Sequence, residues 1–110
     1  MRPYTILLTL FALYIATPIS AAQAAGDIET KQLYVQSLAA TCANCHGTEG
    51  HALSGASVPG LAGRSADELV AQMKAFRSGE RKATIMHQIA KGFSESQTQL
   101  LAEYFAAQKR

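Results

Sequence analysis

The sequence predicts an all-α domain, and three observations support that prediction. Two segments start with a serine followed three residues later by Glu or Gln, at Ser65 and Ser94, which is the capping-box pattern of a helix start. After the first of these serines, apolar side chains recur at helical spacing as Leu69, Met73 and Phe76. No segment alternates apolar and polar residues with the period of two that a half-buried strand requires. We therefore expect about four helices and no sheet.

The first 24 residues have the features of a cleaved secretory signal peptide. Arg2 supplies the positive start, residues 5–16 are apolar, and residues 22–24 (Ala-Gln-Ala) fit a cleavage site. The alternative is an uncleaved anchor helix, but the apolar run is shorter than the roughly 20 residues that span a bilayer. We expect cleavage after residue 24, a periplasmic location and no stable membrane insertion of the mature chain.

Residues 25–110 are expected to form one small domain. A chain of this length has difficulty building a sufficient core alone, and a covalently held cofactor would supply the missing apolar mass. The whole sequence has 10 Lys and Arg against 8 Asp and Glu, with no basic block of the kind that binds nucleic acid. We therefore expect no nucleic-acid partner.

Along this domain, the predicted helices differ in length and are separated by glycine-rich turns. We expect them at residues 27–43, 65–78, 83–91 (a short piece) and 94–108. Gly79 follows the second helix as a C-terminal stop. Residues 47–63 are rich in glycine and contain Pro59, which indicates turns and close approach of the backbone to another group. A planar cofactor edge would need such an approach, although a plain flexible loop has the same composition.

The chemistry of the chain centres on Cys42-Ala43-Asn44-Cys45-His46, the C-x-x-C-H pattern of covalent haem c attachment. Two thiols one helical turn apart can add to the two vinyl groups of one porphyrin, and the next imidazole then lies under the iron. A redox dithiol would need a thioredoxin-like βαβ context, which this sequence lacks. A tetrahedral zinc site would need four ligands, and a disulfide would leave His46 unexplained. We expect one haem c, held by Cys42 and Cys45, with His46 as an iron ligand.

The sixth iron ligand is predicted to be Met86. Met73 lies in an apolar helix stripe, where a methionine fills a core, whereas Met86 lies in a short apolar piece that has little reason to be buried unless it covers something. His87 is the competitor, but adjacent residues on a helix do not share a face, and His51 is too close to His46 along the chain to reach the opposite haem face easily.

A methionine ligand favours electron transfer, whereas an open sixth position would favour a ligand sensor or a peroxidase-like protein. The chain has no nucleophile–base pair that would make it catalytic by itself, so it is either an electron carrier or the haem subunit of an oxidoreductase. Five basic residues could border a docking face for a redox partner, or could equally be ordinary solvated surface: Arg64, Arg77, Arg81, Lys82 and Lys91.

These motifs together resemble the small class I c-type cytochromes of bacteria. The resemblance is carried by residues 42–47 (CANCHG), 59–63 (PGLAG), 76–81 (FRSGER) and Met86, and it covers nearly all of the mature chain. It implies the cytochrome c fold, in which the N- and C-terminal helices cross and the haem lies in a crevice with one edge exposed. It also implies that the carbonyl of Pro59 accepts the ring N–H of His46.

A narrower resemblance concerns residues 83–94 (ATIMHQIAKGFS), which look like the methionine segment of the cytochrome subunit of flavocytochrome c sulfide dehydrogenase. In that family a haem subunit sits on a larger flavoprotein subunit, which oxidises sulfide at its flavin and passes electrons to the haem. The resemblance implies a single-haem subunit of this kind, because the chain has one C-x-x-C-H. The alternative is a free-standing cytochrome that shuttles electrons to a terminal oxidase or a similar acceptor.

Overall fold

The computed structural model describes residues 18–110, and these residues form helices and turns with no strand. The predicted all-α class is therefore confirmed for the described part of the chain. Residues 1–17, most of the expected signal peptide, lie outside it. Among residues 18–110, no helix combines the length and the apolar character needed to cross a bilayer. The helices are α2 (Pro18–Ala40), α3 (Ala43–His46), α4 (Ala66–Ser78), α5 (Met86–Ile89) and α6 (Glu95–Ala106), with 3-10 turns η1 (Thr48–Gly50) and η2 (Ala90–Gly92).

The helix predicted at residues 27–43 has different ends in the structure. Within the described residues α2 extends from Pro18 to Ala40, so it also includes the alanine-rich segment before residue 27, which has high helix propensity. It ends at Ala40, where a turn closes through hydrogen bonds from the backbone N–H groups of Thr41 and Cys42 to the preceding turn. The second cysteine and the histidine then lie on a separate short helix, α3.

The two predicted capping boxes fold differently. At Ser94 the box is complete: the serine hydroxyl accepts from the backbone N–H of Gln97 at 3.1 Å, and the Gln97 side chain accepts from the backbone N–H of Ser94 at 2.9 Å. At Ser65 the hydroxyl accepts from the backbone of Glu68 at 3.2 Å, but the Glu68 carboxylate pairs instead with Arg64, also at 3.2 Å. The prediction of a reciprocal box at Ser65 is therefore wrong in its second half.

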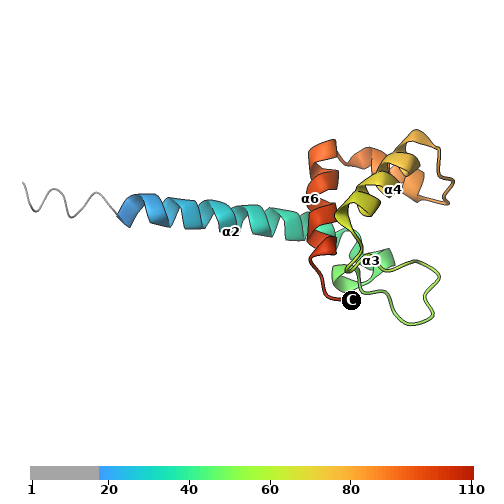
Figure 1. The fold of residues 1–110 in the computed structure, drawn as a ribbon, viewed down its shortest axis with the longest axis horizontal. Coiled ribbons are helices and arrows are strands. Elements are labelled where there is room, and N and C mark those ends of the chain that lie inside the picture. Colours follow the sequence, from blue (N-terminus) through green and yellow to red (C-terminus); the bar gives the residue numbers. More distant parts are fainter. Residues whose placement is uncertain (1–17) are drawn as a thin grey trace, which may run out of the picture. The chain divides into compact units, whose positions relative to one another are not determined.

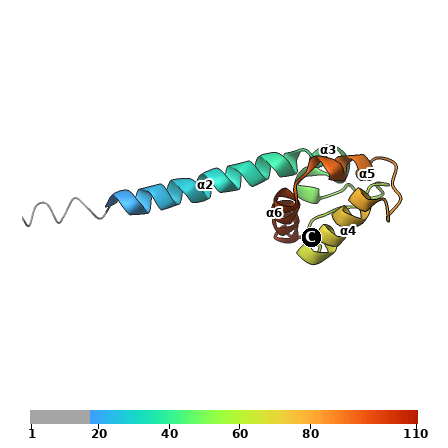
Figure 2. The ribbon, with the colours of Figure 1, turned by 90° about the horizontal axis from the view of Figure 1, so that it is seen from above.

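The chain divides at residue 34 into two units, and all features described below belong to the second unit, Tyr34–Arg110. Its core consists of side chains from α4, α6 and the last turns of α2, and α6 runs across the C-terminal end of α2 (Figures 1 and 2). The buried members are Ala39, Leu69, Leu101, Ala102 and Phe105. Four of these core residues, Leu69, Leu101, Ala102 and Phe105, also line the cavity described below.

The glycine-rich loop after α3 is braced by main-chain hydrogen bonds. The carbonyl of Gly50 accepts from the backbone N–H groups of Leu61 at 2.8 Å and Ala62 at 3.1 Å, and Gly63 donates to the carbonyl of Phe105 at 2.9 Å. Gly50 is buried and adopts φ +81°, a conformation that glycine tolerates best. The loop is therefore built into the domain at both ends, and it brings Pro59 back beside α3.

Candidate cofactor site

A cavity of about 390 Å³ lies within the second unit, bounded by α3, α4, α5, α6 and the loop before α4. That volume is within the range of small-molecule and cofactor sites. Its walls are mainly apolar, and many of the apolar side chains come from segments far apart in the sequence. These include Leu61, Leu69, Met73, Phe76, Ile85, Ile89, Phe93, Leu101 and Phe105.

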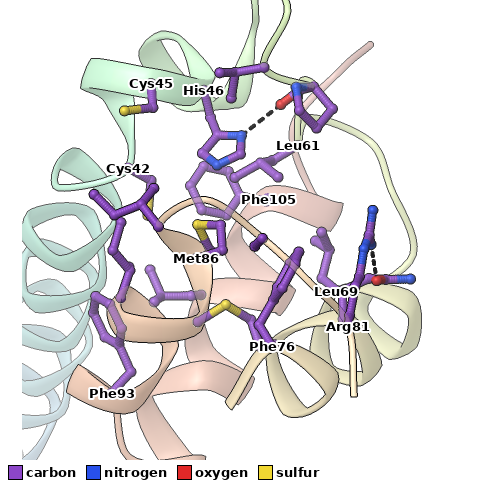
Figure 3. A pocket seen from close by; sticks show the side chains of 18 of the residues that line it. Cys42, Cys45, His46, Leu61, Leu69, Phe76, Arg81, Met86, Phe93 and Phe105 are labelled. Atoms are coloured by element: carbon purple, nitrogen blue, oxygen red, sulfur yellow. Dashed lines mark hydrogen bonds between the residues drawn. The ribbon is translucent and has the colours of Figure 1, made fainter. Parts of the chain in front are cut away.

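His46 is buried on α3, and its ring is fixed by one hydrogen bond. Its Nδ1 lies 2.6 Å from the carbonyl oxygen of Pro59 (Figure 3). A carbonyl oxygen can only accept, so Nδ1 carries the proton and donates it to Pro59. The neutral ring then has its lone pair on Nε2, which is the atom available to a metal. The structure thus contains the contact that the family resemblance implied for Pro59.

Cys42 and Cys45 both line the cavity beside His46, and neither forms a disulfide. Cys42 occupies the N-cap position of α3, which places Cys45 about one turn further along. Burial raises the pKa of the Cys42 thiol above its ordinary value; a hydrogen bond with the Thr41 hydroxyl lowers it, and the nearby Cys45 raises it again. Cys42 is therefore a neutral thiol in an apolar wall, next to the more exposed Cys45.

Met86 lines the same cavity, at the start of α5. In Figure 3 its thioether and the His46 ring extend into the same space from different helices. Met73 also lines the cavity, from α4, so its predicted role as buried core filler is only partly matched. The structure therefore brings both methionines of residues 18–110 to one cavity.

The rings of the other two histidines do not face the cavity. His87 does not line the cavity, and its buried Nδ1 has no hydrogen-bond partner among residues 18–110. Both ring nitrogens of His51 lie near carbonyl oxygens, Nδ1 at 3.1 Å from Thr48 and Nε2 at 2.6 Å from Lys109. Neither ring therefore faces the cavity in the way that the His46 ring does.

Three of the five basic residues suggested as a docking face lie at the cavity. Arg64, Arg81 and Lys82 line the cavity, where their charges could pair with the carboxylates of a ligand. Arg81 is held in place by a hydrogen bond to Gln72 and lies 4.8 Å above the centre of the Phe76 ring. These contacts hold a cation at the cavity wall.

Arg77 has a role that sequence reasoning missed. Its guanidinium donates to the backbone carbonyls of Ala90, at 3.2 Å, and Phe93, and approaches the Thr98 hydroxyl at 3.5 Å. It is therefore directed into the protein rather than toward a docking partner. No sequence signal indicated this, because its main partners are backbone carbonyls 13 and 16 residues away.

Fold and site together define a class of protein. The described chain is all-helical, and its apolar cavity combines paired thiols, a metal-ready imidazole and thioethers with cationic groups. A haem fits this donor set: the thiols can form thioethers with its vinyl groups, the ring and a thioether can ligate iron, and the cations can pair with propionates. The site is that of a helical protein that attaches haem covalently.

Comparison with known proteins gives the family. No family model matches the chain. The cytochrome subunit of sulfide dehydrogenase from Chlorobaculum tepidum is 37% identical over 68 residues, which cover 62% of this chain and 60% of that protein. Cytochrome c-554(548) from Halomonas halodenitrificans is 39% identical over 72 residues, which cover 63% and 86%. The thiosulfate dehydrogenase electron acceptor from Stutzerimonas stutzeri is 47% identical over 68 residues, which cover 59% and 31%.

The chain therefore belongs to the class I c-type cytochromes. The match to cytochrome c-554(548) extends over most of that protein, whereas the chain spans 60% of the sulfide dehydrogenase subunit and 31% of the thiosulfate dehydrogenase electron acceptor. The sequence-based identification of the family is confirmed.

Proposed function

We propose that this cytochrome carries one haem, joined to Cys42 and Cys45, with His46 and Met86 as axial iron ligands, and that it transfers single electrons. The observation that carries the proposal is the cavity in which the Pro59-oriented His46 ring, both cysteines and the Met86 thioether meet. A bound haem supplies the one-electron couple of its iron. The names of the relatives, which are cytochromes and electron acceptors, agree with this role.

The chain's own residues would set the properties of that couple. Pro59 keeps the proton on Nδ1 of His46 and so keeps Nε2 directed at the metal. A Met86 thioether favours the reduced form and therefore a higher reduction potential. The apolar walls exclude water, and two fixed ligands would limit rearrangement when the electron arrives.

The ligand assignment is tested by replacing each cavity methionine separately. We expect Met86→Ala to lose the Met-to-iron charge-transfer band of the ferric protein and to bind added imidazole without competition. Met73→Ala is the matched control, since it truncates the other methionine of the same cavity and should keep the band. Retention of the band in Met86→Ala together with its loss in Met73→Ala would assign the ligand to Met73 instead.

We further propose a periplasmic protein, released by cleavage after residue 24, that accepts electrons as the haem subunit of a flavoprotein sulfide dehydrogenase. Similarity to a cytochrome subunit of sulfide dehydrogenase supports this partner. Mass spectrometry of the protein from the periplasm should give an N-terminus at Ala25. Native purification should give a complex with flavin absorbance, and sulfide should reduce its haem.

The similarity to cytochrome c-554(548), of which the chain covers 86%, favours a second candidate, a free-standing carrier that delivers electrons to an oxidase or a similar acceptor. This candidate predicts a monomer without flavin and only weak, short-lived contacts. Size exclusion with absorbance recorded at haem and flavin wavelengths separates the two candidates. Haem reduction by thiosulfate but not by sulfide in a periplasmic fraction would contradict the sulfide dehydrogenase assignment.

A further inference from the structure

Met86 lies in a segment with few polar ties to the rest of the molecule. α5 is only four residues long, and the hydrogen bonds of Gln88 and Ile89 return to Ile85 within the segment. η2 follows at once and leads into α6 through Phe93 and Ser94. The position of the Met86 thioether therefore depends on what holds this segment against the larger helices.

Besides its packing against α4, the segment is held by Arg77. From the last turn of α4 its Nε donates to the carbonyl of Ala90, and its Nη2 donates to the carbonyl of Phe93. Across the described residues, no other hydrogen bond joins residues 82–93 to α4. The planar guanidinium of Arg77 thus donates to carbonyls at both ends of η2, the turn directly after the helix that carries Met86.

The partners of Arg77 lie in the interior. Ala90 is fully buried, and Thr98 on α6, which its guanidinium also approaches, is 4% exposed. Thr98 in turn donates to the carbonyl of Ser94 at 2.9 Å, so the network continues into the first turn of α6. A guanidinium keeps its charge at all accessible pH values and offers several donors in one plane, which a lysine cannot reproduce.

We propose that Arg77 is a positioning residue that keeps Met86 on the iron by holding residues 90–93 against α4. This inference rests on the proposed Met86 ligation. Without the guanidinium, the carbonyls of Ala90 and Phe93 lose their donor, and the segment detaches more often. The fraction of molecules with an open sixth position then rises.

The test is imidazole binding to the ferric holoprotein, because imidazole can enter only when Met86 leaves. The apparent affinity then scales with the population of the open state. We expect Arg77→Ala to tighten imidazole binding about tenfold or more, and Arg77→Lys, which keeps the charge and one donor, to lie between it and the wild type. Amide hydrogen exchange of residues 86–89 should accelerate in the same order, with no change in the first turn of α4.

Two controls separate positioning from general effects. Lys74→Ala removes one positive charge from the exposed side of the same helix, and Ser65→Ala weakens α4 at its opposite end. Neither should change imidazole affinity by more than about twofold. Equal affinities in the wild type, Arg77→Lys and Arg77→Ala would overturn the inference, as would an equal gain in Ser65→Ala.

The ligand assignment itself has a separate readout. If Met86 is not the ligand, Met86→Ala leaves the ferric charge-transfer band unchanged, and the proposed function fails before Arg77 is considered. If the band depends on Met86 but not on Arg77, and imidazole affinity is unaltered in Arg77→Ala, only the positioning role fails.

Discussion

Replacing Gly50 by alanine tests how the loop after α3 is held. A Cβ at this position would lie 2.8 Å from the backbone nitrogen of Ala62, 2.9 Å from Cδ1 of Phe105 and 3.0 Å from Cβ of Leu61. Two of these neighbours belong to the segment just after Pro59, and the third is a core ring, so none can move aside freely. The Gly50 φ of +81° adds a backbone cost for any L residue.

A matched control variant separates the expected loss of folding free energy into a backbone part and an overpacking part. Gly79, at the end of α4, has the same φ of +81°, and a Cβ there would meet nothing within 4 Å. The left-handed backbone costs about 1–2 kcal/mol in both variants, less about 0.4–1 kcal/mol because alanine restricts the unfolded chain. Overpacking adds about 1–3 kcal/mol at Gly50 alone. We therefore expect Gly50→Ala to lose about 1–3 kcal/mol more than Gly79→Ala.

The assay is urea unfolding of the holoprotein, followed by far-UV circular dichroism, with the slopes compared to check that both variants unfold in the same way. A second readout is the NMR signal of the His46 Nδ1 proton, which should shift in Gly50→Ala, because displacement of residues 61–62 moves the Pro59 carbonyl. It should not shift in Gly79→Ala. Equal losses of stability, with an unchanged His46 proton, would refute the reasoning that Gly50 supports the loop.

Two smaller predictions concern helix capping and pH. Ser94→Ala and Ser65→Ala should each reduce the free energy of unfolding by about 0.5–2 kcal/mol, because each removes the hydroxyl that accepts from the backbone N–H three residues later; an unchanged midpoint in urea titrations of either variant would contradict this. Burial, and secondarily Glu49, raises the pKa of the Tyr104 phenol above its ordinary value of 10.0, so the protonated form is favoured in the native state. The stability that this group contributes is therefore present below pH 10 and declines as the pH rises above that value. Glu49→Gln should lower the Tyr104 pKa, which NMR of 13C-labelled tyrosine can measure. An unchanged pKa would exclude Glu49 as a cause.

Features decided by neighbouring residues were predictable from the sequence. The cap at Ser94 and the stop at Gly79 depend on contacts within three or four residues, and both are present. The box at Ser65 was half wrong because Glu68 has two local partners, the Ser65 backbone and Arg64, and the sequence does not rank them. The C-x-x-C-H motif similarly required only local spacing.

Features decided by packing were not predictable. Arg77 looks like a surface charge in the sequence, yet it bonds to carbonyls of residues that are distant along the chain. A backbone carbonyl is present at every position and leaves no mark on composition, so no motif could identify Ala90 and Phe93 as partners. The same applies to Leu61 and Phe105, which join the cavity wall only because the loop and α6 meet.

On the proposed ligation, the two axial side chains are supported in different ways. His46 is oriented by a carbonyl of Pro59, in a loop that is tied into the domain through Gly50 and Gly63, so its support comes from the main chain. Met86 depends on carbonyls whose donor is a single side chain, Arg77. A substitution can remove a side chain but not a carbonyl. Substitution of Arg77 is therefore expected to loosen the methionine side of the site while His46 stays in place, whereas the His46 side is disturbed through the glycines that support its loop, such as Gly50.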